Sequence, residues 1–139
     1  MGRGQRGKKW ISYKGNLSVS IFFSLEKINL TLKQLTTVNA KLIIKLISHY
    51  YKNKIKLKLP NDILIKRRKI CGILQETIQK NGVTYLIVGI GINLVKSPNI
   101  KDYPTTNLYE LTKTQLSAKK MTKKLVFIYN DFLKTQKVF

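Results

Sequence analysis

The sequence is poor in the residues that build disulfides and resident metal sites. It has one cysteine, Cys71, so no internal disulfide can form, as is typical of proteins in a reducing cytosol. Its one histidine, His49, has no cluster of Cys or His partners, so we expect no metal site. No hydrophobic run approaches the roughly 20 residues that span a bilayer, and no apolar stretch follows the basic N-terminus. We therefore expect a cytoplasmic protein without a membrane segment.

Acidic residues are scarce. Six Asp and Glu stand against 27 Lys and Arg, which gives a formal net charge of +21. Such an excess attracts polyanions, so a basic nucleic-acid-binding protein is one hypothesis. The lysines, however, are spread along the whole chain, and there is no helix-turn-helix, zinc or RNP pattern. This distribution favours a generally lysine-rich composition, and we expect no specific nucleic-acid partner.

Hydrophobic periodicity predicts both strands and helices. Alternating and continuous apolar residues predict strands at Leu17–Phe23 and Thr84–Leu94. A long helix is expected after a cap at Asn29 or Thr31, and a final helix after a cap at Ser117. The stripe of the long helix is Leu32, Leu35, Val38, Leu42, Leu46 and Tyr50, and Ile43 and Ile47 widen it.

The fold class follows from the order of these elements. Asn81-Gly82 is a strong signal for a two-residue hairpin, so the strands on either side of it pair antiparallel. A short helix is expected at Leu108–Leu111. At 139 residues the chain has the commonest domain size, about 100–150 residues. We predict one α+β domain, residues 1–139, with a mixed, largely antiparallel sheet covered by the long helix and the C-terminal helix.

A lysine and an aspartate lie inside apolar strand patterns in the middle of the chain. Residues 56–64 indicate a strand, a corner at Pro60-Asn61-Asp62 and a second strand; residues 69–74 indicate a third strand after a basic turn at Arg67-Arg68. A carboxylate and an ammonium set among Ile and Leu usually pair or face a polar ligand. This conflict between pattern and chemistry predicts a site around Asp62 and Lys69.

Glycines mark two further candidate positions. Residues 2–10 read GRGQRGKKW, a basic loop whose glycines allow close approach to an anion, although a solvated basic terminus is an open alternative. The GxGxxG spacing is not a dinucleotide fingerprint here, because only Met1 precedes it and a turn signal follows. Gly89 and Gly91 fall on one strand face, which admits a flat group or simple sheet packing. Asn93, at the end of that strand, has an amide that can pair with a heterocycle.

Four motifs in series resemble those of biotin protein ligases. Residues 2–10 are similar to the GRGRRGRxW loop of that family, and Lys58-Leu59-Pro60-Asn61-Asp62 to its KWPND motif. Residues 69–74, KICGIL, resemble its K-x-[AGS]-G-I-L strand, and residues 89–93 match its GIGIN. Order and spacing agree over nearly the whole chain. The resemblance is to the central catalytic domain of a bacterial biotin–[acetyl-CoA-carboxylase] ligase, with a fold like that of class II aminoacyl-tRNA synthetases.

The resemblance implies a two-step reaction and a set of site residues. Biotin and ATP, with Mg²⁺, would form biotinyl-5′-AMP, and the biotinyl group would pass to a lysine of the biotin carboxyl carrier protein. Lys69 would be catalytic and would contact the biotin carboxylate and the adenylate phosphate. Biotin and the adenylate would be bound by Arg3, Gly4, Gln5 and Lys69. ATP would be bound by Arg6, Lys8, Trp10, Asn61, Asp62 and Asn93.

The chain departs from the family pattern at several points. Gln5 and Lys8 replace arginines, and Leu59 replaces the tryptophan of KWPND. The Ser/Thr-Thr-Asn biotin loop upstream of the glycine loop, a DNA-binding domain and an SH3-like C-terminal domain are not found, so we expect a partial catalytic domain. Alternatives are an inactive remnant, a lipoate-type ligase and a basic nucleic-acid-binding protein. A homodimer is left open.

The glycines of the loop predict a segment that becomes ordered when ligand binds. We expect residues 2–9 to be protected from proteases by biotinyl-adenylate. Limited proteolysis with and without this compound, followed by mass spectrometry, measures the effect. Cleavage in this segment at an unchanged rate would contradict the expectation.

Overall fold

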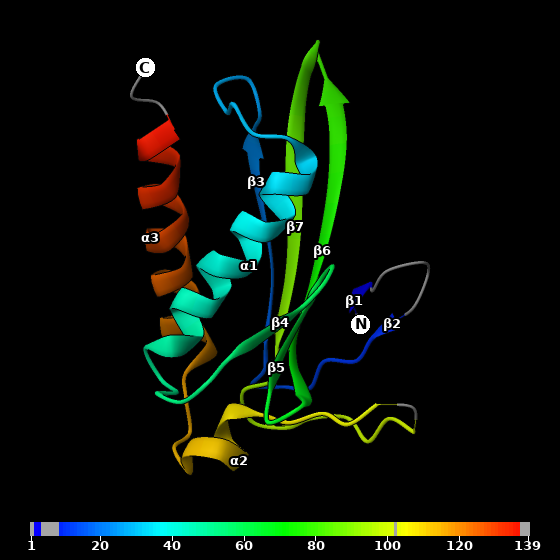
Figure 1. Ribbon diagram of the computed structural model, residues 1–139, viewed down its shortest axis with the longest axis vertical. Helices are drawn as coiled ribbons and strands as arrows, with labels where there is room; N and C mark the ends of the chain where they lie inside the picture. The colour runs from blue at the N-terminus through cyan, green and yellow to red at the C-terminus, as the bar shows by residue number, and fades with distance from the viewer. Residues whose placement is uncertain (1, 4–8, 102, 137–139) are drawn as a thin grey trace.

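The computed structural model describes residues 2–3, 9–101 and 103–136. Its centre is a five-stranded antiparallel sheet in the order β3-β7-β6-β5-β4. Two helices, α1 and α3, cover one face of this sheet (Figure 1). A pair of two-residue strands, β1 (Gly2–Arg3) and β2 (Lys9–Trp10), lies on the side away from the helices. The expected α+β fold with a largely antiparallel sheet is confirmed.

Strands form at each predicted position, although the strand predicted over 69–74 extends to Lys80 and the one predicted over Thr84–Leu94 ends at Ile92. They are β3 (Leu17–Ser24), β4 (Lys56–Lys58), β5 (Asp62–Ile65), β6 (Arg68–Lys80) and β7 (Val83–Ile92). The β6–β7 hairpin turns at Asn81-Gly82 with φ of 53° and 77°, as predicted for that dipeptide. The preceding turn is at Lys66-Arg67, both with positive φ, and Ile65 pairs with Arg68. The predicted turn at Arg67-Arg68 was therefore wrong by one residue.

The helices begin at the expected caps. Helix α1 (Leu32–Ser48) starts with a capping box, in which Thr31 accepts from the Gln34 backbone and the Gln34 side chain accepts from the Thr31 backbone. Helix α2 spans Leu108–Thr112, and α3 spans Ala118–Gln136 after Ser117. None of the helices among the described residues is long and apolar enough to cross a membrane.

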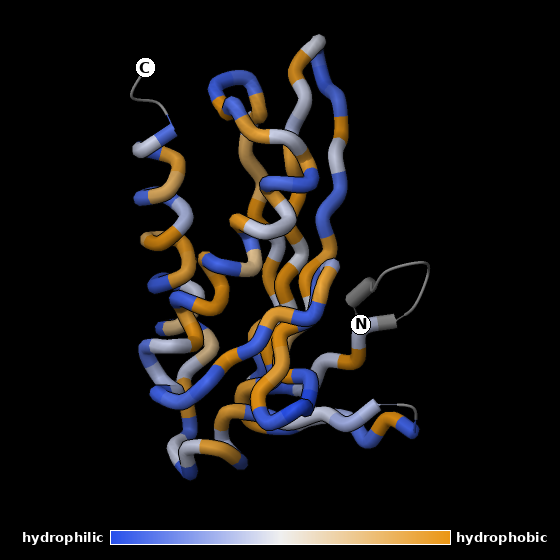
Figure 2. Tube along the Cα trace, in the orientation of Figure 1, coloured by the Kyte–Doolittle hydropathy of each residue, from blue (hydrophilic) through white to orange (hydrophobic). Residues whose placement is uncertain are grey.

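The core lies between the helices and the sheet. Hydrophobic and hydrophilic residues alternate along α3 (Figure 2), and the hydrophobic ones pack on β3 and α1. The buried face of α1 differs in part from the predicted stripe, because Leu32 is half exposed while Asn39 is buried. The buried residues of α1 are Leu35, Asn39, Ala40, Ile43, Leu46 and Ile47.

A polar network joins the two helices to the sheet. Asn39 of α1 accepts a hydrogen bond from the Tyr129 hydroxyl of α3 at 2.8 Å and donates to Gln75 of β6 at 2.7 Å. Gln75 in turn donates to the Leu32 carbonyl at 3.0 Å. Burial raises the pKa of Tyr129, so its hydroxyl keeps its proton and remains a donor. The network fixes the register of both helices on β6.

Tyr129→Phe tests this network. It leaves the buried Asn39 oxygen without its donor, so we expect a loss of about 1–3 kcal/mol in the free energy of unfolding. Urea titration followed by circular dichroism measures it. Tyr109→Phe, at an exposed tyrosine, is the matched control and should change little. Equal stability of the two variants would argue against the network.

Candidate functional site

A β-bulge turns Lys69 toward the face of the sheet that lacks helices. On β5, Ile63 pairs with Cys71 and its neighbour Leu64 pairs with Lys69, so Ile70 is an extra residue in β6. Strict alternation would place Lys69 on the same face as Cys71, in the core. The bulge instead places Lys69 on the side of Asp62 and Gly72, which pair with each other. A charged side chain within an apolar strand thus leaves the core.

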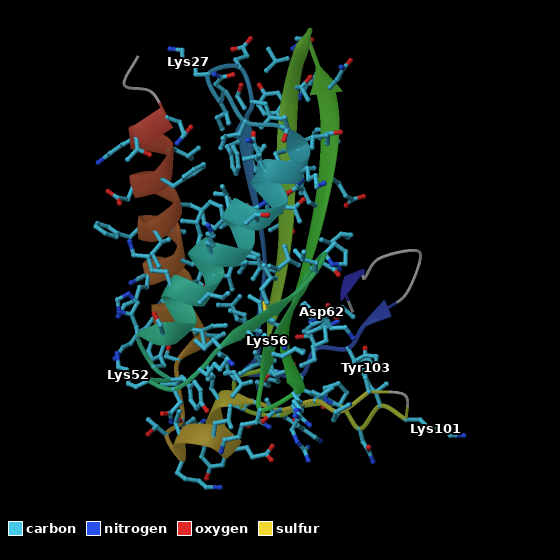
Figure 3. All side chains as sticks on the ribbon, in the orientation of Figure 1. Lys27, Lys52, Lys56, Asp62, Lys101 and Tyr103 are labelled. Carbon is cyan, nitrogen blue, oxygen red and sulfur yellow. The ribbon has the colours of Figure 1, made fainter. Side chains whose placement is uncertain are left out.

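The Lys69 ammonium lies among one carboxylate and two aromatic rings. Its Nζ is 2.9 Å from Asp62 Oδ1, and the Lys69 side chain is 15% exposed. It is also 5.4 Å from the ring centres of both Trp10 and Tyr103, within range of a cation–π interaction. Figure 3 shows Asp62 and Tyr103 on the same side of the sheet, away from α1 and α3. The expected pairing of Asp62 with Lys69 is confirmed.

The loop after β7 is attached directly to Lys69. The Lys69 N–H donates to the Pro104 carbonyl at 2.9 Å, and its carbonyl accepts from the Thr106 N–H at 3.0 Å. Thr105 lies beside Lys69 in this short parallel bridge, which brings Tyr103 over the ammonium. Sequence reasoning missed Tyr103, because only the long-range bridge places it here. In the sequence, Tyr103 is an aromatic residue in a proline-containing loop, and that pattern does not predict a functional site.

Trp10 lies flat on a pair of glycines in the sheet. Gly72 of β6 and Gly91 of β7 are cross-strand partners. A Cβ at Gly72 would come within 2.9 Å of the indole, and one at Gly91 would overlap it. The predicted close approach of a flat group to Gly91 is thus made by Trp10 itself. At Gly89 the nearest atoms are in ordinary contact at 3.7 Å.

Two cavities adjoin Trp10 and Lys69. The larger, about 150 Å³, is also lined by Asn61, Leu74, Gly89 and other sheet residues. The smaller, about 10 Å³, is lined by Ile11, Asn93 and Tyr103 in addition to Trp10 and Lys69. Trp10 and Lys69 are the two residues common to both linings. The indole ring of Trp10 and the ammonium of Lys69 thus form a boundary that is common to the two cavities.

The predicted site residues fall into two groups. The structure brings together five of them, in and around the two cavities: Trp10, Asn61, Asp62, Lys69 and Asn93. Gly4, Gln5, Arg6 and Lys8 lie outside the described residues, and Arg3 is described only by its backbone pairing with Lys9. The binding and catalytic roles of all ten residues stay predictions.

Asn93 is buried and takes part in hydrogen bonds within the protein. Its Nδ2 donates to the Thr106 carbonyl at 3.1 Å, and its Oδ1 has a long contact of 3.5 Å from Asn16 Nδ2. The amide nitrogen of Asn93 therefore holds the loop, while its amide oxygen is only weakly hydrogen-bonded. Asn93 joins the strand end to the loop that carries Tyr103.

Neither a nucleophilic cysteine nor a resident metal cluster is found here. Cys71 is fully buried, and this burial raises the pKa of its thiol, which stays protonated at neutral pH. Within residues 2–3, 9–101 and 103–136, no group of three His, Cys, Asp or Glu side chains is placed to hold a metal ion. Lys69 is a charged residue in the linings of both cavities.

Comparison with known proteins agrees with these features. The profile of the "Biotin/lipoate A/B protein ligase family" matches residues 1–93. The chain belongs to this family. The bifunctional ligase/repressor BirA of Escherichia coli is 35% identical over 95 residues, which are 67% of this chain and 30% of the relative. A biotin–[acetyl-CoA-carboxylase] ligase of Paracoccus denitrificans is 32% identical over 101 residues, 70% of this chain and 42% of the relative.

Solved structures of the family share the fold. The biotin protein ligase of Aquifex aeolicus, in complex with biotin and ATP, superposes with a TM-score of 0.82 at 30% identity. The match covers 98% of this chain and 57% of that protein. The chain thus spans only part of the length of the family members it resembles.

Gly91→Ala tests the seating of Trp10. A methyl group at this position overlaps the indole, which must lift from the sheet toward solvent. Because Trp10 is the one tryptophan, its fluorescence reports the change, and we expect a red shift of emission. Gly89→Ala, with its 3.7 Å contacts, is the control and should emit like the unmodified protein. If both variants emitted alike, the assigned position of Trp10 would be wrong.

Proposed function

We propose that this chain is a partial catalytic domain of an ATP-dependent biotin–protein ligase. It would form biotinyl-5′-AMP and transfer biotin to a lysine of the carrier protein of acetyl-CoA carboxylase. The observation that carries the proposal is the pair of cavities that share Trp10 and Lys69. An acyl-adenylate has two ring systems joined through a carboxyl-phosphate linkage. The larger cavity would take one ring system, Lys69 would meet the linkage, and the smaller cavity would have to widen for the other ring system.

The first step joins two anions, and Lys69 is the group that lowers its barrier. A biotin carboxylate oxygen attacks the α-phosphorus of ATP, an O–P bond forms, and the bond to pyrophosphate breaks. A fixed ammonium at the junction offsets the repulsion between carboxylate and phosphate and stabilises the charge that develops. Asp62, 2.9 Å away, and the Trp10 ring hold Lys69 in place before ligand arrives. Positioning would supply most of the remaining catalysis.

The larger cavity would take the bicyclic ring of biotin. Its lining combines glycines and apolar side chains such as Leu74 with polar ones such as Ser20 and Glu76, which suits a compact ring system that carries polar groups. Gly89 lacks a side chain that would fill the space beside Leu74. The ring's carboxylate tail would then extend past Trp10 toward Lys69.

The smaller cavity would take adenine after the loop moves. At about 10 Å³ it does not hold a purine, so Tyr103 or Ile100 must swing outward for the nucleotide to enter. Trp10 would stack on the base, and the weakly bonded Asn93 oxygen would accept from the exocyclic amine. Arg3, Gly4, Gln5, Arg6 and Lys8 would close over the adenylate and its phosphates.

The second step transfers the acyl group. The amine of a carrier lysine attacks the biotinyl carbonyl, an amide bond forms, and AMP leaves with the electron pair of the broken C–O bond while the nitrogen loses a proton. Burial of the linkage between Trp10 and Lys69 would keep water from competing with the amine.

Mg²⁺ would arrive with the ATP phosphates. In the part of the chain that the structure describes, no three acidic, His or Cys side chains converge on a metal position, and Asp62 is paired with Lys69. The described residues therefore do not form a dedicated Mg²⁺ site, and no catalytic step is assigned to the ion. Magnesium commonly binds through substrate phosphates with few protein ligands.

Lys69→Ala tests the proposal. We expect ATP- and biotin-dependent adenylate formation to fall at least about a hundredfold, because the charge at the junction is lost. The assay follows labelled biotin into biotinyl-AMP, and circular dichroism checks that the fold survives. Lys66→Ala, at the exposed turn before β6, is the matched control and should retain activity.

The same assay separates the competing functions. Replacing biotin by lipoate tests the lipoate-type ligase, and an apo carrier domain tests transfer. Retained activity in Lys69→Ala would remove this residue from the mechanism. A folded, unmodified chain that forms no adenylate from either acid would indicate a non-catalytic remnant.

A further inference from the structure

One carboxamide anchors the whole start of the loop that follows β7. Asn16 Oδ1 accepts hydrogen bonds from three successive backbone N–H groups, those of Leu94 at 3.0 Å, Val95 at 2.9 Å and Lys96 at 3.3 Å. Its Nδ2 donates to the Lys96 carbonyl at 2.7 Å. These bonds link positions nearly eighty residues apart. A single side chain that satisfies four backbone groups of one distant segment acts as a clamp.

The local backbone is shaped for this clamp. Asn16 closes a turn in which its N–H donates to the Tyr13 carbonyl at 2.9 Å. Gly15, inside the turn, has φ of +94°, and a Cβ there would lie 2.9 Å from a Val95 methyl. Only glycine combines this conformation with such close approach. The turn and the Leu94–Lys96 segment are therefore fitted to each other by backbone as well as by side chain.

The clamp joins the two walls of the smaller cavity. On one side, Asn16 follows the segment that carries Trp10 and Ile11. On the other, the clamped amides lie between Asn93 and the loop that carries Tyr103. Asn16 Nδ2 also has the 3.5 Å contact to Asn93 Oδ1. The larger cavity, in contrast, is built mostly from sheet positions that do not depend on this loop.

We propose that Asn16 is a positioning residue that sets the nucleotide half of the site. This inference rests on the proposed function. It adds that the sheet shapes the cavity for the acid, whereas Asn16 shapes the cavity for the adenine. Without its oxygen, three N–H groups lose their common acceptor and the Tyr103 loop shifts relative to Trp10. The KM for ATP should therefore rise, whereas the KM for biotin should change little.

Two variants of similar size separate the acceptor from simple packing. Asn16→Asp keeps an oxygen for the three N–H groups, whereas Asn16→Leu has none. We expect Asn16→Leu to raise the KM for ATP about tenfold to a hundredfold, the range for a displaced binding group. Its KM for biotin should change by less than about threefold, because neither Asn16 nor the clamped segment lines the larger cavity. Asn16→Asp keeps the common acceptor but loses the donor to the Lys96 carbonyl, so its KM for ATP should lie between those of the unmodified protein and Asn16→Leu.

A second measurement needs no ligand. In the ligand-free protein, hydrogen exchange at Leu94, Val95 and Lys96 should be at least about tenfold faster in Asn16→Leu, because local opening becomes easier. Asn16→Asp should keep more of the protection than Asn16→Leu, because the three N–H groups retain an acceptor. Asn53→Leu, at an exposed asparagine, is the control and should alter neither exchange nor kinetics.

The outcomes separate this inference from the proposed function. Unchanged exchange in Asn16→Leu, or equal rises in the KM for ATP and biotin, would overturn the inference while the ligase activity stands. If the unmodified protein forms no adenylate, the proposed function falls and the nucleotide role falls with it. The exchange data would then still decide whether Asn16 anchors the loop.

Discussion

An extra residue in β6, Ile70, determines on which face of the sheet the Lys69 side chain lies. Without the bulge, Lys69 would point into the core beside Cys71, where an unpaired ammonium would be strongly disfavoured. With it, Ile70 and Cys71 are both buried and Lys69 reaches Asp62 on the open face. One local irregularity thus allows an apolar strand to carry a charged side chain on its open face. Bulges commonly re-aim side chains in this way beside active sites.

The rest of the site is arranged around that lysine. Asp62 holds its ammonium, the Pro104–Thr106 backbone brackets its peptide group, and Trp10 seats on the glycines next to it. The helices contribute indirectly, because they pack on the opposite face and fix β6 through Asn39 and Gln75. One face of the sheet therefore packs against the core, and the other face lines the two cavities.

Much of this fold was predictable from local signals. The Asn81-Gly82 hairpin, the Thr31 cap and the strand patterns depend on neighbouring residues, and each was found where expected. The turn at Lys66-Arg67 was misplaced by one residue, because neither residue carries the usual preference for positive φ. Turn chemistry that lacks glycine or asparagine leaves the register to tertiary packing.

Half of the predicted site residues lie together in the structure, but their geometry could not be predicted. Motif order singled out Trp10, Asn61, Asp62, Lys69 and Asn93, and the structure places them together. The bulge, the bridge from Lys69 to Thr105 and the Asn16 clamp all join distant segments, and nothing in a single sequence reports such contacts. Tyr103 and Asn16 were missed for that reason. The roles of Gly4, Gln5, Arg6 and Lys8 stay predictions, since they lie outside the described residues.

The central claim is that one ligand occupies both cavities, with its linkage at Lys69. The most direct test is an isotope-edited nuclear Overhauser experiment on the protein bound to a non-hydrolysable biotinyl-sulfamoyl-adenosine. We expect contacts from the bicyclic ring to Leu74 and Gly89, and from the adenine protons to Trp10 and Tyr103. Both ring systems in contact with the same cavity, or adenine in contact with neither aromatic residue, would contradict it.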